Sequence, residues 1–190
     1  MNLSSILSFT KAWVKESLFE GAVAVDATVG NGNDTLFLAK AVGAKGRVFG
    51  FDIQAQALNQ TRSLLIEAGV ESRVSLFQRG HHRLAETLAE TNVPSVQAVM
   101  FNLGYLPQGD PSITTLPETT LTAVDQSLNL IATGGTLTLV LYTGHPGGEE
   151  EASAVLERLT TLDPRFFDSA HYRLLNRNRA PSLVIVRKKK

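Results

Sequence analysis

Short apolar runs alternate with longer amphipathic segments along this chain. The apolar runs predict strands, at residues 22–27, 47–51, 74–78, 96–102, 136–142, 168–175 and 182–187. Apolar positions spaced three or four apart predict helices, at residues 3–18, 33–42, 54–68, 80–90, 117–132 and 148–162. Strands follow one another directly only at the end of the chain. The pattern therefore predicts an α/β fold with a seven-stranded, mostly parallel sheet and a C-terminal antiparallel hairpin.

The bulk composition predicts one globular domain over residues 1–190, with a helix in residues 1–20 packed on it and Trp13 in its core. Hydrophobic residues make up 43% of the 190 residues and charged residues 19%. The absence of cysteine excludes disulfides and thiolate metal sites, and four histidines without a helical pair lead us to expect no metal. No apolar run has the length of a membrane span, and no signal-peptide pattern opens the chain. We therefore expect a cytoplasmic protein without membrane contact.

A glycine-rich turn follows the first predicted strand and reads D-A-T-V-G-N-G-N-D from Asp26 to Asp34. Gly30 and Gly32 can take positive φ and lack a Cβ, so a ligand can approach the backbone closely. The dinucleotide pattern requires a third glycine where Thr35 stands. The turn instead resembles the first motif of class I S-adenosylmethionine (SAM) methyltransferases. On the residues alone, nucleotide binding and a purely structural turn stay open.

A second acidic residue, Asp52, ends the next predicted strand about twenty residues further along. A carboxylate at this position can accept hydrogen bonds from both hydroxyls of a ribose. Asp26 at the end of the first strand would suit the cationic groups of SAM. Both residues are therefore candidates for cofactor binding.

The fourth predicted strand ends in N-L-G-Y-L-P-Q-G-D, from Asn102 to Asp110. Amino-methylating class I enzymes often carry Asn/Asp-Pro-Pro-Tyr there, and Asn102 and Tyr105 occupy similar places. The Asn carbonyl and a backbone carbonyl can accept both protons of an amine and so aim its lone pair at a methyl group. An aromatic ring can cover the sulfonium or stack on a base. The alternative is a glycine–proline turn with a buried tyrosine.

Two further polar stretches are expected at the same edge of the sheet, T-L-P-E-T-T from Thr115 and Y-T-G-H-P-G-G-E-E from Tyr142. Open α/β sheets bind ligands at the carboxyl ends of their strands. His145 in the second stretch could act as a general base or hold substrate, or be an exposed loop histidine. Amine selection by positioning, without a base, is the interpretation that we favour slightly.

Together, D-A-T-x-G-N-G, N-L-G-Y-L-P-x-G-D, T-x-P-E-T-T and Y-x-G-H-x-G-G-x-x-E resemble the rRNA methylase family over about residues 25–186. Members of this family are known as tRNA methyltransferases that methylate the terminal amine of 5-aminomethyl-2-thiouridine at the wobble position. The resemblance implies a Rossmann-like class I methyltransferase fold, SAM as cofactor and S-adenosylhomocysteine (SAH) as product, and the tRNA anticodon loop as partner. The second enzymatic interpretation is methylation of rRNA or of a small-molecule amine. A non-catalytic SAM-binding factor for RNA assembly is the alternative of another class.

The resemblance implies three groups of site residues. The catalytic candidates are Asn102, Tyr105 and His145. The cofactor-binding candidates are Asp26, Thr28, Gly30, Asn31, Gly32, Asn33, Asp34, Thr35, Asp52, Ile53, Gln54, His81, Asn102 and Leu103. The substrate-binding candidates are Tyr105, Pro107, Asp110, Glu118, Thr119, Tyr142 and His145. The chain departs from the family at Asn33, where histidine is usual, and at His82, where glutamate is usual; both residues of His81–His82 could instead be surface residues at a helix cap.

Charge is balanced overall but not along the chain. The formal net charge is zero, which argues against broad nonspecific binding to nucleic acid and fits a compact target such as one anticodon loop. Basic residues gather near the C-terminus, namely Arg173, Arg177, Arg179, Arg187, Lys188, Lys189 and Lys190. They could contact phosphates, or the last of them could be a solvated end. A domain of this size could also form a homodimer to widen its RNA surface.

Overall fold

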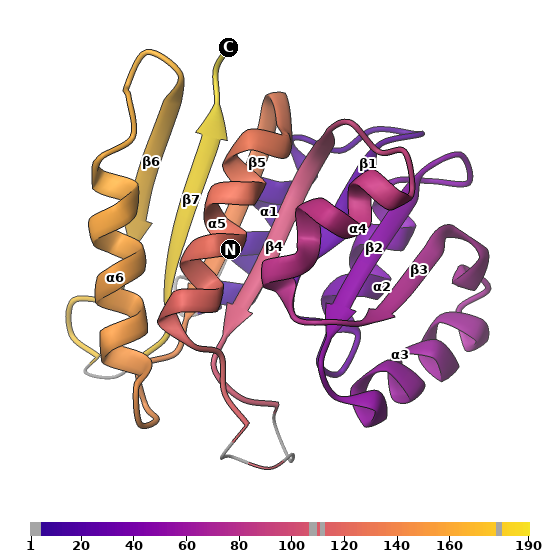
Figure 1. The fold of residues 1–190 in the computed structure, drawn as a ribbon, viewed down its shortest axis with the longest axis horizontal. Helices are drawn as coiled ribbons and strands as arrows, with labels where there is room; N and C mark the ends of the chain where they lie inside the picture. Colours follow the sequence, from indigo (N-terminus) through magenta and orange to yellow (C-terminus); the bar gives the residue numbers. More distant parts are fainter. Residues whose placement is uncertain (1–4, 107–109, 111–112, 178–179) are drawn as a thin grey trace.

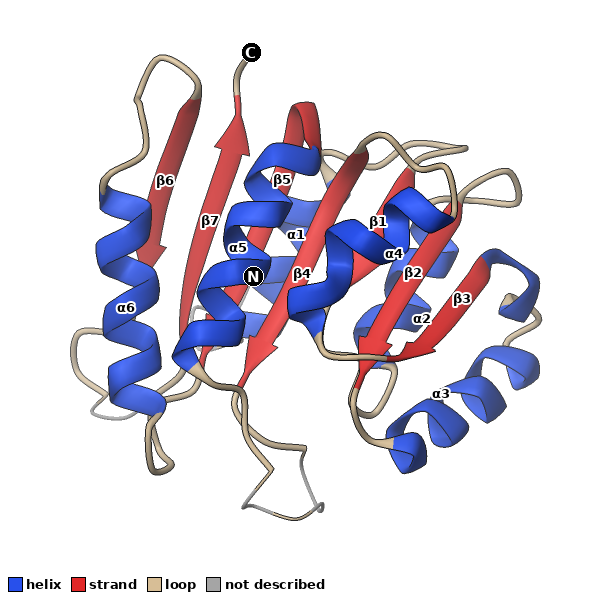
Figure 2. Ribbon diagram, in the orientation of Figure 1, coloured by secondary structure: helices blue, strands red, loops and turns tan. Residues whose placement is uncertain are grey.

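The computed structural model describes residues 5–106, 110, 113–177 and 180–190. Its strands form one seven-stranded sheet in the order β3-β2-β1-β4-β5-β7-β6 (Figures 1 and 2). The strands are β1 (Val23–Asp26), β2 (Arg47–Asp52), β3 (Val74–Gln78), β4 (Val96–Leu103), β5 (Ile131–Leu141), β6 (Phe167–Tyr172) and β7 (Ser182–Lys188). Strand β7 runs antiparallel to both of its neighbours, and the remaining pairs are parallel. The predicted mostly parallel sheet with a C-terminal hairpin is confirmed.

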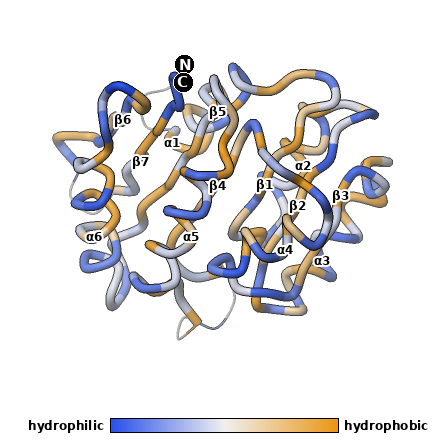
Figure 3. Tube along the Cα trace, turned by 45° about the horizontal axis from the view of Figure 1, so that its top comes forward, coloured by the Kyte–Doolittle hydropathy of each residue, from blue (hydrophilic) through white to orange (hydrophobic). Residues whose placement is uncertain are grey.

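Helices cover both faces of the sheet. They are α1 (Ile6–Lys15), α2 (Asn33–Ala41), α3 (Ala55–Glu67), α4 (Leu84–Glu90), α5 (Pro117–Leu130) and α6 (Gly148–Thr160), with 3-10 turns at Glu71–Arg73 and His81–Arg83. Apolar residues of α4, α5 and α6 pack on one face, and those of α1, α2 and α3 pack on the other. Figure 3 shows apolar stretches along the central strands, which both helical layers enclose. The central strands β1, β4 and β5 read as nearly continuous apolar runs because both faces of the sheet are buried there.

Two details differ from the sequence-based expectation. Trp13 is 39% exposed, whereas Ile6, Thr10 and Val14 form the buried side of α1. The three buried positions repeat every four residues, and Trp13 lies beside that stripe, so its predicted place in the core is wrong. Strand β5 starts at Ile131, before the Gly134–Gly135 pair that was expected to precede it. Val96 of β4 pairs with Ile131, but Ala98 pairs with Thr136, so the register of the two strands shifts between these pairs. The segment of β5 that contains Gly134 and Gly135 lies within this shift.

The parallel strands bring their carboxyl ends to one edge of the sheet. The loops after β1, β2, β3, β4 and β5 therefore lie at the same edge, as do the residues between β6 and β7. The C-terminus lies at the opposite end of the sheet because β7 runs the other way (Figure 1). Among the described residues, no helix combines the length and apolar character that crossing a membrane requires.

Candidate functional site

A cavity of about 870 Å³ opens at the carboxyl ends of β1, β2 and β4. The strand order reverses between the parallel strands β1 and β4, because β2 and β3 lie on one side of β1 and the later strands lie on the other. Such a switch point leaves a crevice where α/β sheets bind ligands. Thr28 closes the bottom of the crevice because its hydroxyl accepts the backbone N–H of Asn102 at 2.7 Å. The volume is within the range of small-molecule and cofactor sites.

The glycine turn forms one wall of this cavity. Gly30 has φ of 51°, and a Cβ there would meet the Leu106 Cδ1 atom at 3.4 Å. Gly32 has φ of 77° and packs away from the cavity, where a Cβ would lie 2.5 Å from the Thr61 hydroxyl oxygen. Gly32 is therefore required for packing of the turn on α3, while Gly30 lets a ligand approach the backbone.

Asp26 lies beneath the turn and is fully buried. Its carboxylate accepts hydrogen bonds from the Thr35 hydroxyl at 2.6 Å and from the Thr28 backbone N–H at 3.2 Å. Burial above all, together with the nearby Asp34 carboxylate, raises the pKa of Asp26 to about 7, although the bonds from Thr35 and Thr28 oppose the rise. Asp26 does not line the cavity. In this structure it acts on the turn rather than on a ligand.

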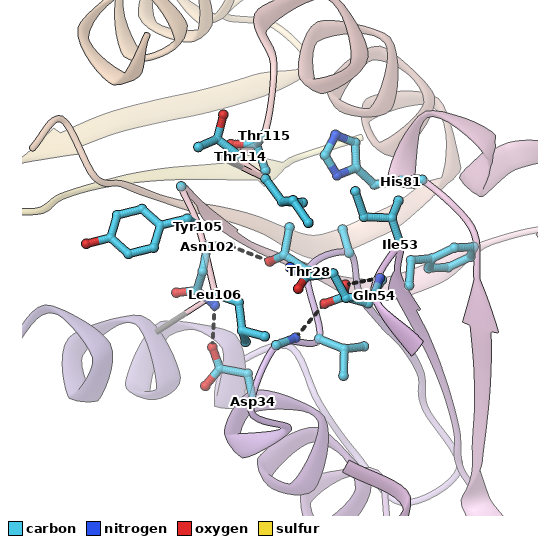
Figure 4. A pocket seen from close by; sticks show the side chains of 18 of the residues that line it. Thr28, Asp34, Ile53, Gln54, His81, Asn102, Tyr105, Leu106, Thr114 and Thr115 are labelled. Atoms are coloured by element: carbon cyan, nitrogen blue, oxygen red, sulfur yellow. Dashed lines mark hydrogen bonds between the residues drawn. The ribbon is translucent and has the colours of Figure 1, made fainter. Parts of the chain in front are cut away.

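Asp52 reaches the cavity from the end of β2. Its two oxygens accept the backbone N–H groups of Gly30 and Gln54, each at 2.9 Å. Each carboxylate oxygen has a second lone pair that can accept from a ligand hydroxyl. Figure 4 shows Thr28, Ile53, Gln54 and His81 around this part of the cavity. Burial lowers the pKa of His81 to about 4 and the proximity of His82 contributes, so His81 is neutral near pH 7.

Asn102 lies between the turn and the loop after β4. Its Nδ2 donates to Asp34 Oδ2 at 2.8 Å (Figure 4). Its Oδ1 is buried and has no hydrogen-bond partner among the described residues. A buried acceptor without a donor costs about 1–3 kcal/mol. Asn102 therefore presents an unused acceptor where the sequence predicts the reacting group.

The rings of Tyr105 and His145 contact each other in the loops after β4 and β5. Their rings are 5.8 Å apart and perpendicular, and Tyr105 is 47% exposed at the cavity. The Nδ1 of His145 lies 3.0 Å from the carbonyl oxygen of Pro146 and must donate to it, because a carbonyl only accepts. The Nε2 atom is buried and has no partner among the described residues. His145 itself does not line the cavity.

A buried carboxylate, Glu151, joins the other two motif stretches. It is 2% exposed and accepts the hydroxyls of Thr115 and Thr120, each at 2.6 Å. Thr120 also lies 3.4 Å from the His81 ring. This glutamate is the last residue of the motif Y-x-G-H-x-G-G-x-x-E, and no role was predicted for it from the sequence. Glu151 follows two other glutamates at the start of α6, and only Glu151 is buried. The local sequence does not show which of the three acids faces the interior.

The structure brings together most predicted site residues. Those that line the cavity are Thr28, Gly30, Asn31, Asn33, Asp34, Asp52, Ile53, Gln54, His81, Asn102, Tyr105, Thr119 and Tyr142. Those that do not are Asp26, Gly32, Thr35, Leu103, Asp110, Glu118 and His145. Asp26, Thr35 and Leu103 are buried behind the wall, whereas Asp110 and Glu118 are exposed. Pro107 lies outside the described residues.

Several lining residues were not predicted as site residues from the sequence, among them Leu7, Lys11, Arg79, His82, Leu106 and Thr115. Leu7 and Lys11 belong to α1, far from every motif in the chain. No local pattern marks them, because they meet the site only through the packing of α1. Among the described residues, no group of three or more His, Cys, Asp or Glu side chains could hold a metal ion.

Comparison with known proteins decides the family. The model of the family described as "Putative rRNA methylase" matches residues 48–188. The chain belongs to this family. The match starts after the glycine turn, so the turn and α1 lie outside it.

Relatives of known name or structure support the same placement. A protein of Arabidopsis thaliana, the chloroplastic tRNA (mnm(5)s(2)U34)-methyltransferase, is 40% identical over 178 residues. The match covers 90% of this chain but 64% of the Arabidopsis protein. A structure described as a putative rRNA-methylase from Clostridium thermocellum has 43% identity and a TM-score of 0.92, covering 96% of this chain and 97% of that one. A putative methyltransferase from Streptococcus mutans in complex with SAH has 36% identity and a TM-score of 0.85, with the same coverage. The predicted class I methyltransferase fold is confirmed.

Proposed function

We propose that this chain is a SAM-dependent methyltransferase of RNA that methylates the terminal amine of 5-aminomethyl-2-thiouridine at the tRNA wobble position. The unpartnered Oδ1 of Asn102 carries the proposal, because it is an acceptor for an amine N–H at the cavity that the glycine turn also lines. The Arabidopsis relative, named for this position of tRNA, supports the choice of substrate.

The glycine-turn wall fits SAM. Asp52 is placed to accept from the ribose hydroxyls, and its bonds to Gly30 and Gln54 hold it in place. Ile53 is 54% exposed and offers an apolar surface to the adenine. Bound SAM supplies an electrophilic methyl group to the acceptor. The structure of the Streptococcus mutans relative with SAH supports this choice of cofactor.

The chain's contribution to methyl transfer is orientation. An amine attacks through its lone pair, so its N–H groups must point away from the methyl group. Asn102 Oδ1 accepts one N–H and thereby turns the lone pair toward the glycine-turn wall. Tyr105 covers the reacting groups and can stack on an unpaired base of the anticodon loop.

His145 supports Tyr105 in this proposal. The ring contacts Tyr105, and an added Cβ on Gly104 or Gly148 would lie within 3.5 Å of its Nε2. A general base must come within hydrogen-bond reach of the proton it removes. His145 is separated from the cavity, so selection of the free amine by positioning is the simpler mechanism.

Nucleoside mass spectrometry of tRNA from cells with and without this gene tests the proposal. We expect 5-aminomethyl-2-thiouridine to accumulate without the gene and its methylated form to disappear. Purified chain with SAM should then restore the methyl group on that tRNA. Unchanged tRNA together with a lost methyl group in rRNA would replace tRNA by rRNA as the substrate. Unchanged nucleosides in all RNA, with RNA bound by the purified chain, would make it a non-catalytic binding factor.

A further inference from the structure

The side chain of Asn102 is held in one orientation by a charged partner. An ionised carboxylate only accepts hydrogen bonds, so Asp34 can face only the NH₂ end of the Asn102 amide. The carbonyl end must then point the other way, and this is the Oδ1 atom without a partner. A neutral amide or hydroxyl at position 34 could pair with either end and would leave the orientation open.

Asp34 is in turn paired with a lysine of the first helix. Lys11 Nζ lies 3.0 Å from Asp34 Oδ1, and the Asp34 side chain is 10% exposed. The same ammonium lies 3.5 Å from the Asn33 carbonyl oxygen and 5.5 Å from the centre of the Phe37 ring. Three partners from α2 thus fix Lys11 at the rim of the cavity, which it also lines.

The charge of Lys11 matters for the chemistry proposed above. A largely buried, unpaired carboxylate next to the acceptor amine would stabilise the ammonium form, which has no lone pair. Lys11 offsets this charge. The other titratable groups near Asp34 are Asp26 below it and Tyr142 across the cavity, while Asp52 and His145 lie further along the site.

We propose that Asp34 and Lys11 are positioning residues for methyl transfer. Asp34 fixes the Asn102 amide with Oδ1 toward the acceptor amine, and Lys11 neutralises Asp34 so that the amine loses its proton more readily. The inference rests on the proposed function for the identity of the acceptor. It gives α1, which lies outside the family match, a direct part in the site.

Single-turnover kinetics at saturating SAM separate this role from cofactor binding. Asp34→Ala should lower the rate of methyl transfer about 10²-fold, while the Kd for SAM changes less than about threefold. Lys11→Met should move the acidic limb of the pH–rate profile upward by about 0.5–1 pH unit, because it exposes the Asp34 charge to the amine. Lys11→Arg should restore the wild-type limb. Lys15→Met removes a charge from an exposed position of the same helix and should leave the limb in place.

The side-chain amide of Asn102 gives a readout that needs no activity. In ¹⁵N–¹H spectra, assigned by its loss in Asn102→Ala, one amide proton should be shifted downfield and protected from exchange in the wild-type chain. Asp34→Ala should abolish both properties, and Lys11→Met should weaken them.

Different results of these measurements would overturn different parts of the proposal. An Asn102 signal that is identical in Asp34→Ala overturns the positioning role even if tRNA is methylated. Parallel loss of SAM affinity and turnover in Asp34→Ala would make Asp34 a cofactor-binding residue and also overturn it. A pH limb that stays in place in Lys11→Met rejects the charge role of Lys11. Absence of methylation of any tRNA by the wild-type chain, with the amide signal behaving as expected, defeats the proposed function but leaves the orientation of Asn102 by Asp34 in place.

Discussion

The two walls of the cavity are held together in different ways. In the glycine-turn wall, Asp26 accepts from Thr28 and Thr35, two and nine residues away. In the wall formed after β4 and β5, Glu151 accepts from Thr115 and Thr120, 36 and 31 residues away. Asn102 and Asp34, 68 residues apart, join the two walls. The buried carboxylate of the first wall therefore bonds within β1, the turn and α2, while Asp52 and Thr61 hold the same turn from β2 and α3. The second wall requires α5 and α6 to dock correctly.

The largest expected effect tests whether the Asn102 side of the cavity serves methyl transfer while the glycine-turn wall serves SAM binding. Asn102→Ala should lower single-turnover methyl transfer by about 10²-fold or more, because orientation of the amine acts on the chemical step. The Kd for SAM, measured by calorimetry, should stay nearly unchanged. Equal loss of turnover and SAM affinity, with a lowered Tm, would mark Asn102 as structural.

Asp52→Ala should produce the opposite pattern. Loss of a carboxylate that binds ribose should weaken SAM binding by roughly 1.5–3 kcal/mol, measured by calorimetry. The rate at saturating SAM should fall much less. Unchanged SAM affinity in this variant would reject the ribose assignment.

Glu151→Gln tests whether the second wall depends on its buried carboxylate. The amide NH₂ cannot accept, so one of the two threonine hydroxyls loses its acceptor, at a cost of about 1–3 kcal/mol in the free energy of unfolding. Urea denaturation measures this cost, and Glu150→Gln is the matched exposed control on the same helix. Equal stability of the two variants would contradict the bridging role of Glu151.

The buried acid of the first wall predicts a pH dependence of stability. The folded-state pKa of Asp26 is raised from 3.8 to about 7, so folding favours its protonated form. This contribution to stability is present at low pH and is lost as the pH rises through that interval. Asp26→Asn should flatten the decline in unfolding free energy between about pH 4 and 7, by a few kcal/mol at most. Parallel profiles of the two proteins in urea titrations would contradict the raised pKa.

The smallest expected effect concerns the basic residues near the C-terminus. In the structure these residues form two groups at opposite edges of the sheet. Arg173 and Arg177 lie between β6 and β7, at the same edge of the sheet as the cavity, whereas Arg187 and the lysines that follow lie at the opposite edge (Figure 1). Lys188 donates to the Ile131 carbonyl oxygen and Lys189 pairs with Asp168.

Deleting residues 188–190 should therefore leave the salt dependence of tRNA binding nearly unchanged. Replacing Arg173 and Arg177 with Gln should flatten its slope by about one or two units. The reverse result, a slope changed by the deletion and not by the double variant, would place RNA at the far end of the sheet.

Local sequence was sufficient for the elements and for the glycine turn. Periodicity located the strands and helices because each buries at least part of its surface. The turn was predicted because its glycines and Asp26 form a short local motif, although Asp52 and Thr61 also bond to Gly30 from 22 and 31 residues away. Thr28, Gly30, Asp52 and Asn102 were predicted at the site and line the cavity.

Only the tertiary structure determined which side chains line the cavity and which are buried behind its wall. Lys11 and Glu151 are ordinary charged residues of amphipathic helices until α1 and α6 pack beside the loops. Asp26 and Asp52 both end a strand, yet one is sealed under the turn and the other faces the cavity. The exposure of a side chain and the partner of a charge depend on segments far away in the chain, so no local pattern could distinguish these residues.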